Sequence, residues 1–524
     1  MSWLNLIFLL YQLIAIGVVI HIIMDNRQPV KTMAWGLVIL FVPVIGMIAY
    51  LFFGVNTRRE HMVGRRSLDQ LTKRSMLGFV EQQDLQLPGE YKPIIDLFIN
   101  QGFSLPFNNN KVELLTNGYE FFPSLLRDIA HARNHIHVDM YIFEDDALGR
   151  LIADALMAKA REGVEVRVIY DDVGCWSVSN RFFEQMREAG IEVEAFLPVR
   201  FPSFTSKANY RNHRKIVVID GLVGYVGGMN IALRYVHTPP KLRGHRGLNK
   251  WWSKKAGSAP QPPNLGGLWR DTMARIEGRG VYSLQRAFLI DWYFVDRTLL
   301  SDWKYYPSNA TLGPQGRLPE QEYTMHRAEH SCSGKRPCGP SGALLQTVTS
   351  SPISPYPEIM QGYVRLIMSA RRYIYIETPY FLPTDPVLFA LKTAAQTGVD
   401  VRLLAPRKGD ARITEWACRS YLREAQEAGI QVSLYEAGFL HSKLMVCDDK
   451  VCTCGSTNVD FRSFENNFEA NTFFYDEQVA QRMRDIFLDD ERHSVALSKL
   501  SNRIHPSFRV RLLEGLARLF SPLL

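Results

Sequence analysis

The sequence is poor in cysteine, and neither sign of charge dominates it. Its 524 residues include seven cysteines, an odd and thinly spread set that forms no disulfide framework. We therefore expect a protein of a reducing compartment. Lysine and arginine number 61 against 53 acidic residues, a net charge of +8. This mild excess favours an anionic partner: a nucleic acid, a membrane surface or a phosphate-bearing substrate.

Compositional bias is missing as well. The chain is 46% hydrophobic and 22% charged, which excludes a disordered polymer, a collagen-like repeat and a coiled-coil rod. At this length the chain is expected to bury a large core in about two to four domains.

Two long uncharged segments open the chain, Leu4 to Met24 and Met33 to Gly54. Each is long enough to cross a bilayer, which takes about 20 helical residues. A secretory signal followed by a buried helix is the alternative. The first segment lacks a basic start and a small-residue cleavage site, and its apolar stretch is too long for a signal. The pattern predicts a two-helix transmembrane hairpin within residues 1–57.

The charges flanking this hairpin predict its orientation. Four arginines lie within residues 58–66, whereas the bend at residues 25–32 carries two basic residues and one acidic residue. Basic residues collect on the cytoplasmic side of membrane segments. We therefore expect the bend outside and the remaining chain in the cytoplasm.

The remaining chain contains one α/β unit twice. A helix and an alternating strand within residues 124–141 are matched within residues 358–377. Valine-rich strands and glycine-containing turns follow in both copies, at 163–168 and 188–193 in the first and at 398–403 and 427–432 in the second. Alternating strands and helices predict two α/β domains, each on a mixed or largely parallel sheet.

A polar signature recurs at matched spacing in both copies. Its members are a histidine, a lysine, an aspartate, a glycine and an asparagine: His213, Lys215, Asp220, Gly227 and Asn230, then His441, Lys443, Asp448, Gly455 and Asn458. Residues two apart on a strand share a face, so each histidine and its lysine point the same way. The aspartate falls outside this face, and we expect it to hold a turn or to pair with a basic neighbour.

This doubled His-x-Lys-x4-Asp signature resembles that of the phospholipase D superfamily. Further segments extend the resemblance to the bacterial cardiolipin synthases: residues 32–35, 43–46, 50–54, 269–271, 275–278, 378–381 and 521–524. The resemblance implies two tandem α/β sandwich domains related by a pseudo-twofold axis and meeting at one site.

The resemblance also implies a mechanism and its residues. One imidazole attacks a phosphodiester phosphorus and forms a phosphohistidine, while the other acts as general acid and then as general base. The implied catalytic set is His213, Lys215, Asp220, His441, Lys443 and Asp448. Lys215 and Lys443, with Asn230 and Asn458, are expected to hold the phosphate oxygens. No metal and no cofactor are expected, because the two lysines supply the positive charge.

In this family an acidic residue downstream of each motif orients the imidazole. Glu469 follows the second motif and fits His441, and Asp271 follows the first motif and would serve His213. A surface carboxylate is the alternative for both. The sequence departs from its relatives at Met273, where they usually place a histidine, so any substrate contact of that histidine is lost or reassigned here.

Six segments are predicted. They are a hairpin anchor (1–57), a juxtamembrane linker (58–105), the first domain (106–330) with an insertion (237–267), a linker (331–345), the second domain (346–498) and an amphipathic tail (499–524). The insertion is basic and contains two tryptophans, which suits either an anionic lipid interface or a solvated loop. The tail is expected to lie on the membrane or on the second domain.

The leading functional hypothesis is cardiolipin synthesis in the bacterial inner membrane. One phosphatidylglycerol gives its phosphatidyl group to a second, and glycerol is released. With water as the acceptor, the same site would be a phospholipase. With serine or phosphatidylethanolamine as the acceptor, it would be another phosphatidyltransferase. A membrane-tethered nuclease and a non-catalytic scaffold are the remaining alternatives, but the hairpin argues against nucleic acid as a partner. The histidine acting as nucleophile and homodimer formation remain open.

Overall fold

The structure is a computed structural model, and it describes most of the chain. The described residues are 3–24, 29–42, 44, 46–47, 49–50, 89–102, 104–199, 210–236, 268–300, 302–307, 342–500 and 506–524. The whole insertion predicted at 237–267 and most of the linker predicted at 331–345 lie outside them. Strand β10 begins at Ala343, within that predicted linker.

The first half of the fold is a mixed sheet between two helical layers. Its strands run in the order β1-β9-β7-β6-β2-β3-β4, and β2, β3 and β4 are parallel. The strands are β1 (Pro106–Leu115), β2 (His135–Met140), β3 (Glu165–Asp171), β4 (Glu192–Phe196), β6 (Lys215–Ile219), β7 (Val223–Gly227) and β9 (Met273–Glu277). The helices are α6 (Gly118–His131), α7 (Ala147–Arg161), α8 (Asn180–Glu188) and, on the other face, α9 (Val281–Asp296).

The second half repeats this order as β10-β19-β17-β16-β11-β13-β14, with β20 added at the edge. Its strands are β10 (Ala343–Ser350), β11 (Tyr373–Glu377), β13 (Asp400–Pro406), β14 (Gln431–Tyr435), β16 (Leu444–Cys447), β17 (Val451–Gly455), β19 (Asn467–Phe474) and β20 (Ser494–Ala496). Its helices are α10 (Glu358–Ser369), α11 (Asp385–Gln396), α12 (Arg412–Glu427) and α14 (Glu477–Arg492). The shared strand order confirms the two α/β copies expected from the sequence.

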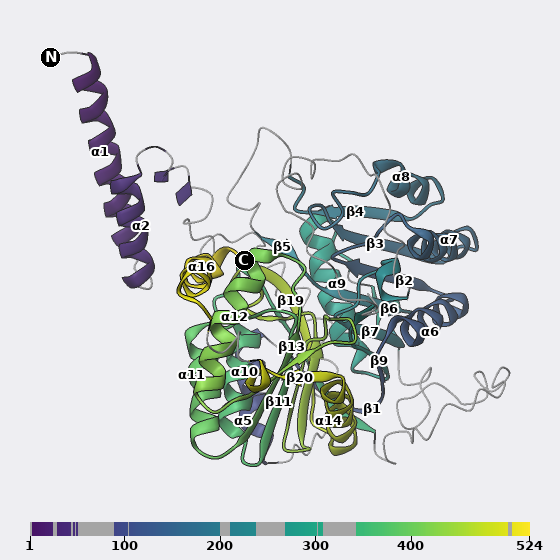
Figure 1. The fold of residues 1–524 in the computed structure, drawn as a ribbon. Coiled ribbons are helices and arrows are strands. Elements are labelled where there is room, and N and C mark those ends of the chain that lie inside the picture. Colours follow the sequence, from purple (N-terminus) through teal and green to yellow (C-terminus); the bar gives the residue numbers. More distant parts are fainter. Residues whose placement is uncertain are drawn as a thin grey trace.

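The two halves are joined into one sheet and then pack face to face. Strand β1 pairs antiparallel with β10, while β7 and β9 contact β17 and β19 across the core. Figure 1 shows α6, α7 and α8 on the outer side of one half and α10, α11 and α12 on the outer side of the other. The core between them takes apolar side chains from both halves, among them Ile216, Val218, Leu444 and Val446.

Local sequence explains why the outer helices form where they do. Helix α7 begins at Asp146, whose side chain accepts a hydrogen bond from the Gly149 amide. Leu148, Ile152 and Leu156 recur at helical spacing, and all three are buried against the sheet.

The termini form separate helices. At the start, α1 (Trp3–Met24) packs against α2 (Pro29–Phe41), with Ile22 and Ile39 in a small apolar cluster. Within the predicted second span of Met33 to Gly54, helix α2 ends at Phe41, residues 46–47 and 49–50 are again helical, and residues 51–54 lie outside the described residues. Of the helices described, none combines the length and the apolar character needed to cross a bilayer.

Asp220 and Asp448 hold turns and lie at the far ends of their strands from the motif lysines. Each has a φ of 55° and follows β6 or β16. The Asp220 carboxylate accepts hydrogen bonds from the amides of residues 133–135, at 2.7 to 2.9 Å. Asp448 does the same for residues 371–373, at 2.8 to 2.9 Å. The turn role predicted from the strand pattern fits this placement, which does not bring either aspartate to the histidines.

We expect Asp220→Ala to destabilise the chain without altering its chemistry. Three backbone amides, of which that of His135 is buried, lose a charged acceptor, and one such bond contributes about 1.5–3 kcal/mol. Asp220→Asn retains one acceptor oxygen and tolerates the positive φ, so it should lose less. Urea unfolding in detergent measures both variants. An Asp220→Asn protein with native stability but no turnover would contradict this structural role.

Candidate active site

Two short strand pairings bring the motif histidines together from opposite halves. Strand β5 (Arg211–Asn212) pairs in parallel with β19 of the second half, and β15 (Phe439–Leu440) pairs in parallel with β8 (Trp269–Arg270) of the first. The His213 amide donates to the Phe468 carbonyl at 2.9 Å, and the His441 amide donates to the Arg270 carbonyl at 2.7 Å. Each histidine backbone is therefore fixed by the opposite half.

The carboxylates that orient the imidazoles are crossed between the halves. His213 Nδ1 lies 3.0 Å from Glu469 Oε1, and His441 Nδ1 lies 2.6 Å from Asp271 Oδ2. Both acids predicted to orient the histidines lie at hydrogen-bond distance from an imidazole, but each contacts the histidine of the other copy, so the predicted partners are corrected. A carboxylate at Nδ1 fixes the proton there and leaves Nε2 as the nucleophilic or basic nitrogen.

Both motif lysines are buried beside the histidines. Lys215 Nζ donates to the His213 carbonyl at 2.6 Å. Lys443 Nζ lies 2.8 Å from His441 Nδ1 and 3.6 Å from Asp271 Oδ2. Neither ammonium is exposed by more than 1%. Two buried cations beside two imidazoles form a site that favours an anion.

Burial sets the protonation states of this site. Burial, aided by the nearby lysines, lowers the pKa of His213 to about 4 and that of His441 to about 3. Burial also lowers the pKa of Lys215 to about 7, with the Lys443 ammonium contributing. Lys443 acts on His213 and Lys215 acts on His441, so the two motifs share one electrostatic site.

The two carboxylates stay ionised in spite of burial. Burial raises the pKa of Asp271, but Lys443 and His441 outweigh it and hold this pKa below its ordinary value. Burial likewise raises the pKa of Glu469, and His213 and Lys215 reverse the shift. Both therefore remain acceptors for the imidazole Nδ1 protons at neutral pH.

Aromatic side chains line the histidines, and the sequence did not reveal them as site residues. The Tyr141 ring lies edge-on to His213 at 4.9 Å, and the Trp269 ring is 4.7 Å from His441. The Tyr235 hydroxyl lies 3.4 Å from His441 Nδ1. Trp269 directly precedes the Arg-Asp pair of the family segment, which is the one sequence signal that could have found it.

Matched arginines hold the backbone of each orienting carboxylate. Arg214 Nε donates to the Glu469 carbonyl at 3.1 Å, and Arg270 Nη1 donates to the Asp271 carbonyl at 2.7 Å. Each arginine is anchored by a buried carboxylate on an inner helix, Arg214 by Asp291 and Arg270 by Asp490.

Each anchoring carboxylate has a buried acidic neighbour on a central strand. Asp139 lies beside Asp291, and Glu377 lies beside Asp490; burial raises the pKa of all four acids. Burial and the neighbouring acid thus favour the protonated form in each pair, and the arginine cation opposes this.

The motif asparagines lie beside the site. Asn230 Nδ2 donates to the Tyr235 hydroxyl at 3.3 Å, which connects it to His441. Asn458 Nδ2 donates to Asp460 at 3.0 Å, and its Oδ1 is buried without a hydrogen-bond partner. An amide has two N–H groups, so each asparagine keeps a donor for a ligand. Met273 is fully buried in the core of the first half, so it takes no substrate contact.

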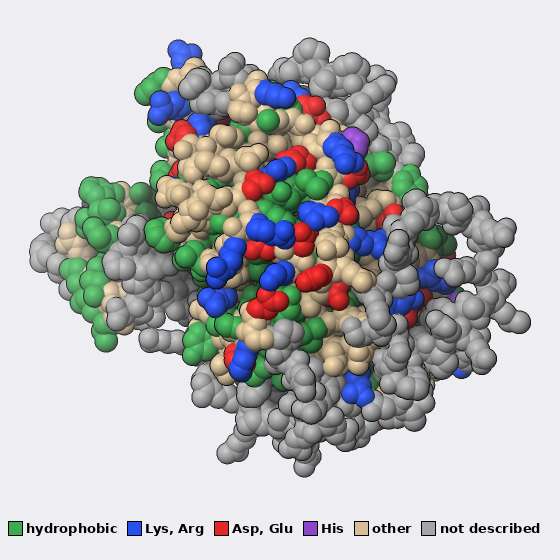
Figure 2. All heavy atoms as spheres, turned by 90° about the horizontal axis from the view of Figure 1, so that it is seen from below, with side chains coloured by type: hydrophobic (Ala, Val, Ile, Leu, Met, Phe, Trp, Pro, Cys, Tyr) green, Lys and Arg blue, Asp and Glu red, His purple; other side chains and the backbone are tan. Residues whose placement is uncertain are grey.

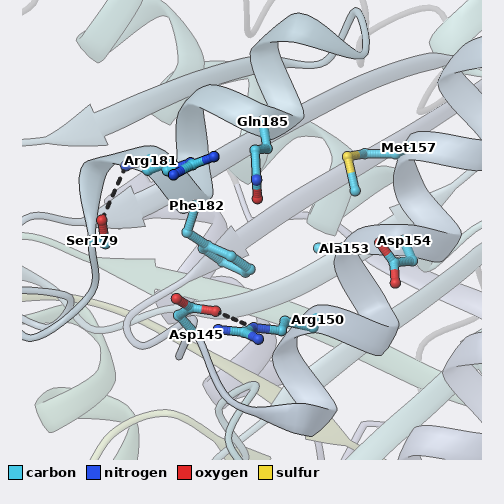
Figure 3. Close-up of a pocket in the computed structure, with 9 residues that line it drawn as sticks. All are labelled: Asp145, Arg150, Ala153, Asp154, Met157, Ser179, Arg181, Phe182 and Gln185. Carbon is cyan, nitrogen blue, oxygen red and sulfur yellow. Dashed lines mark hydrogen bonds and ion pairs between the residues drawn. The ribbon is translucent and has the colours of Figure 1, made fainter.

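A cavity of about 320 Å³ lies between α7 and α8, and none of the motif residues lines it. Figure 3 shows the Asp145–Arg150 ion pair and Phe182 lining it. The described residues include no cluster of three or more histidine, cysteine or acidic side chains arranged to hold a metal.

We expect Gly228→Ala to disable the His441 side of the site. An added Cβ would lie 2.1 Å from Asp271 Oδ1, so the carboxylate must move, and a displacement of about 1 Å can lower a rate about 10²-fold. The matched position in the other half is Ser456, whose hydroxyl donates to Glu469. Ser456→Ala removes the hydrogen bond to Glu469 and the one that the hydroxyl accepts from the Ala470 amide, but it leaves the carboxylate in place and should lose only about tenfold. Turnover and unfolding are measured for both; native turnover in Gly228→Ala would contradict this geometry.

Acidification should destabilise the chain through the two histidines. Their folded pKa values, about 4 and about 3, lie below the ordinary 6.5. Between these values and 6.5 the histidines are therefore protonated in the unfolded chain and neutral in the folded chain. Stability is therefore lost as the pH falls below 6.5, by about 2 kcal/mol per histidine at pH 5. Urea unfolding at pH 7 and pH 5 measures this loss. The double variant His213→Asn/His441→Asn should lose less, and an equal loss would contradict the assignment.

Comparison with known proteins places the chain in a family. The family described as "Cardiolipin synthase, PLD-like domain" matches residues 125–238 and 363–491, which contain both motifs. A second, described as "Phospholipase_D-nuclease N-terminal", matches residues 13–54.

Full-length relatives and one solved structure agree with these matches. The major cardiolipin synthase ClsA of Bacillus subtilis (strain 168) is 35% identical, covering 99% of this chain and 98% of the relative. The cardiolipin synthase of Geobacillus kaustophilus (strain HTA426) is 36% identical over 97% and 92% of the two chains. A crystal structure of phosphatidylserine synthase from Haemophilus influenzae Rd KW20 shares the fold, with 15% identity, a TM-score of 0.57 and coverage of 83% of this chain and 100% of the other. The chain therefore belongs to the bacterial cardiolipin synthases of the phospholipase D superfamily.

Proposed function

We propose that this chain transfers a phosphatidyl group from one phosphatidylglycerol to a second, which forms cardiolipin and releases glycerol. The observation that carries the proposal is the pair of buried imidazoles, each tethered at Nδ1 to a carboxylate. Two such imidazoles beside two lysines suit a two-step exchange at phosphorus, and the relatives named above support the choice of lipid.

The proposed exchange takes place in two steps. Nε2 of one histidine attacks the phosphorus and forms an N–P bond, while the P–O bond to the glycerol head group breaks. The second histidine, as an imidazolium, gives its proton to the departing alkoxide. It then takes the proton of a hydroxyl on the second phosphatidylglycerol, whose oxygen attacks the phosphorus and breaks the N–P bond.

Substrate binding prepares this acid. In the free site the pKa of each histidine lies at about 4 or below, so both imidazoles are neutral. A phosphodiester anion beside them raises these pKa values, because an opposite charge favours the protonated form. The lysines, Asn230 and Asn458 would hold its non-bridging oxygens as charge develops. No metal is needed in this scheme.

Other acceptors and other substrates remain competitors. Water would make the site a phospholipase, and serine or phosphatidylethanolamine would give other phosphatidyl products. A nuclease is disfavoured, because the relatives named above are cardiolipin synthases. The face in Figure 2 carries interleaved basic and acidic side chains.

We also propose that residues 1–57 anchor the chain in the bacterial inner membrane as a two-helix hairpin, with both halves in the cytoplasm. Large apolar side chains are exposed along α1 and α2, including Ile16 at 57%, Leu40 at 69% and Phe41 at 74%. An exposed apolar surface of this extent typically marks a membrane or protein contact. The match of residues 13–54 supports an anchor of the family's kind.

Head-group-labelled phosphatidylglycerol tests the reaction directly. We expect the detergent-solubilised chain to release glycerol and form cardiolipin with a chelator present. His213→Ala and His441→Ala should each lose about 10²-fold or more. His493→Ala removes an exposed histidine outside the site and should retain full turnover. Phosphatidic acid as the only product would establish a phospholipase, and no turnover by the unaltered chain would bring the nuclease alternative forward.

A further inference from the structure

The C-terminal helix α16 (Phe508–Leu519) rests on α12 through a mostly polar face. Glu514 pairs with Arg423 at 2.6 Å, and the Arg518 guanidinium lies 3.9 Å from the centre of the Tyr421 ring. Arg518 also pairs with Glu424 at 2.6 Å. Ala517 is the buried apolar residue of this contact. Charged groups thus fasten the helix to the protein.

The opposite face of α16 is apolar and exposed. Its large side chains are 44% to 78% exposed: Phe508, Leu512, Leu513, Leu516, Leu519 and the following Phe520. At 100° per residue these positions span an arc of about 140°, within which Arg509 also lies. A helix of a globular domain normally turns such a face toward the core. Here the arrangement is reversed, which marks a surface made for an apolar partner.

The charges of this segment select the partner. Arg509 and Arg511 are exposed, and the one acidic residue within 506–524 is Glu514, which is buried in its ion pair. An amphipathic helix with basic residues beside an apolar face binds anionic lipid, with its apolar face in the head-group and acyl boundary.

The position of α16 connects this surface to the active site. The turn after it, η9 (Ser521–Leu523), contacts α13 (Phe461–Glu465). Helix α13 begins at Asp460, which accepts the hydrogen bond from the motif residue Asn458. Figure 1 shows α16 on the side of the molecule toward α1 and α2.

We propose that α16 is a second membrane contact, which lies in the interface of an anionic bilayer and holds the Asn458 side of the active site at the lipid surface. The proposal rests on the proposed use of membrane lipids as substrates. If α16 lies in the bilayer interface, a lipid has a shorter path from the bilayer to the active site. This contact differs from the hairpin anchor, because it sets the orientation of the second half relative to the bilayer.

A fluorescent reporter on the full-length chain tests this contact without turnover. Leu516→Cys is labelled with an environment-sensitive dye, and Leu151→Cys, 51% exposed on α7, is the matched control. The labelled unsubstituted chain gives the background from native cysteines. Each protein is reconstituted in phosphatidylglycerol vesicles that carry nitroxide-labelled lipid acyl chains.

We expect the Leu516→Cys dye to shift to shorter wavelength and to be quenched by about twofold or more, while the Leu151→Cys dye remains in water. The same result is expected in a His213→Ala background, so failure of the proposed reaction would not hide it. A Leu516→Cys dye that stays in water would overturn the proposal. So would a dye shielded from lipid but sensitive to the protein-to-lipid ratio, which would assign this face to a second copy of the chain.

Discussion

Two parallel strand pairings between the halves, β5 with β19 and β8 with β15, hold the catalytic centre together. Each pairing covers only two residues, yet each fixes a histidine backbone and places its imidazole against a carboxylate of the other half. Neither half contains a complete site, because His213 needs Glu469 and His441 needs Asp271. The joint sheet and the shared apolar core are therefore requirements of the chemistry as well as of stability.

Burial is the second constraint. A buried ammonium or imidazolium is unfavourable without a partner. In this site two ionised carboxylates beside the histidines are those partners. The arginines Arg214 and Arg270 fix the backbone of those carboxylates and are themselves held by buried acids. The result is a rigid site in which two lysines face two carboxylates and the histidines are neutral until an anion enters. Such preorganised charge stabilises a transferring phosphoryl group without reorganisation during the step.

The repeat, its alternation of strands and helices and the motif residues could be predicted from the sequence, because they depend on local spacing. The turn role of Asp220 and Asp448 followed from their being out of phase with His213 and His441 on a strand. The crossed carboxylates could not be read this way. They depend on which strand ends meet across the halves, and chain order places each acid after the motif of its own half.

Other site features have no local pattern at all. Gly228 and Ser456 occupy matched positions, but only the structure shows that one leaves room for Asp271 and the other donates to Glu469. Asp291 and Asp490 are ordinary acidic residues of helices α9 and α14. Their role appears only when α9 packs beside Arg214 and α14 beside Arg270.

The crossed pairing is tested most directly by an experimental structure of the full chain in phosphatidylglycerol nanodiscs, in the free state and after reaction. We predict Nδ1 of His213 within hydrogen-bond distance of Glu469, Nδ1 of His441 within that distance of Asp271, and a phosphorus on Nε2 of one of them. Each imidazole paired with the carboxylate of its own half, or the two histidines held apart, would contradict the account.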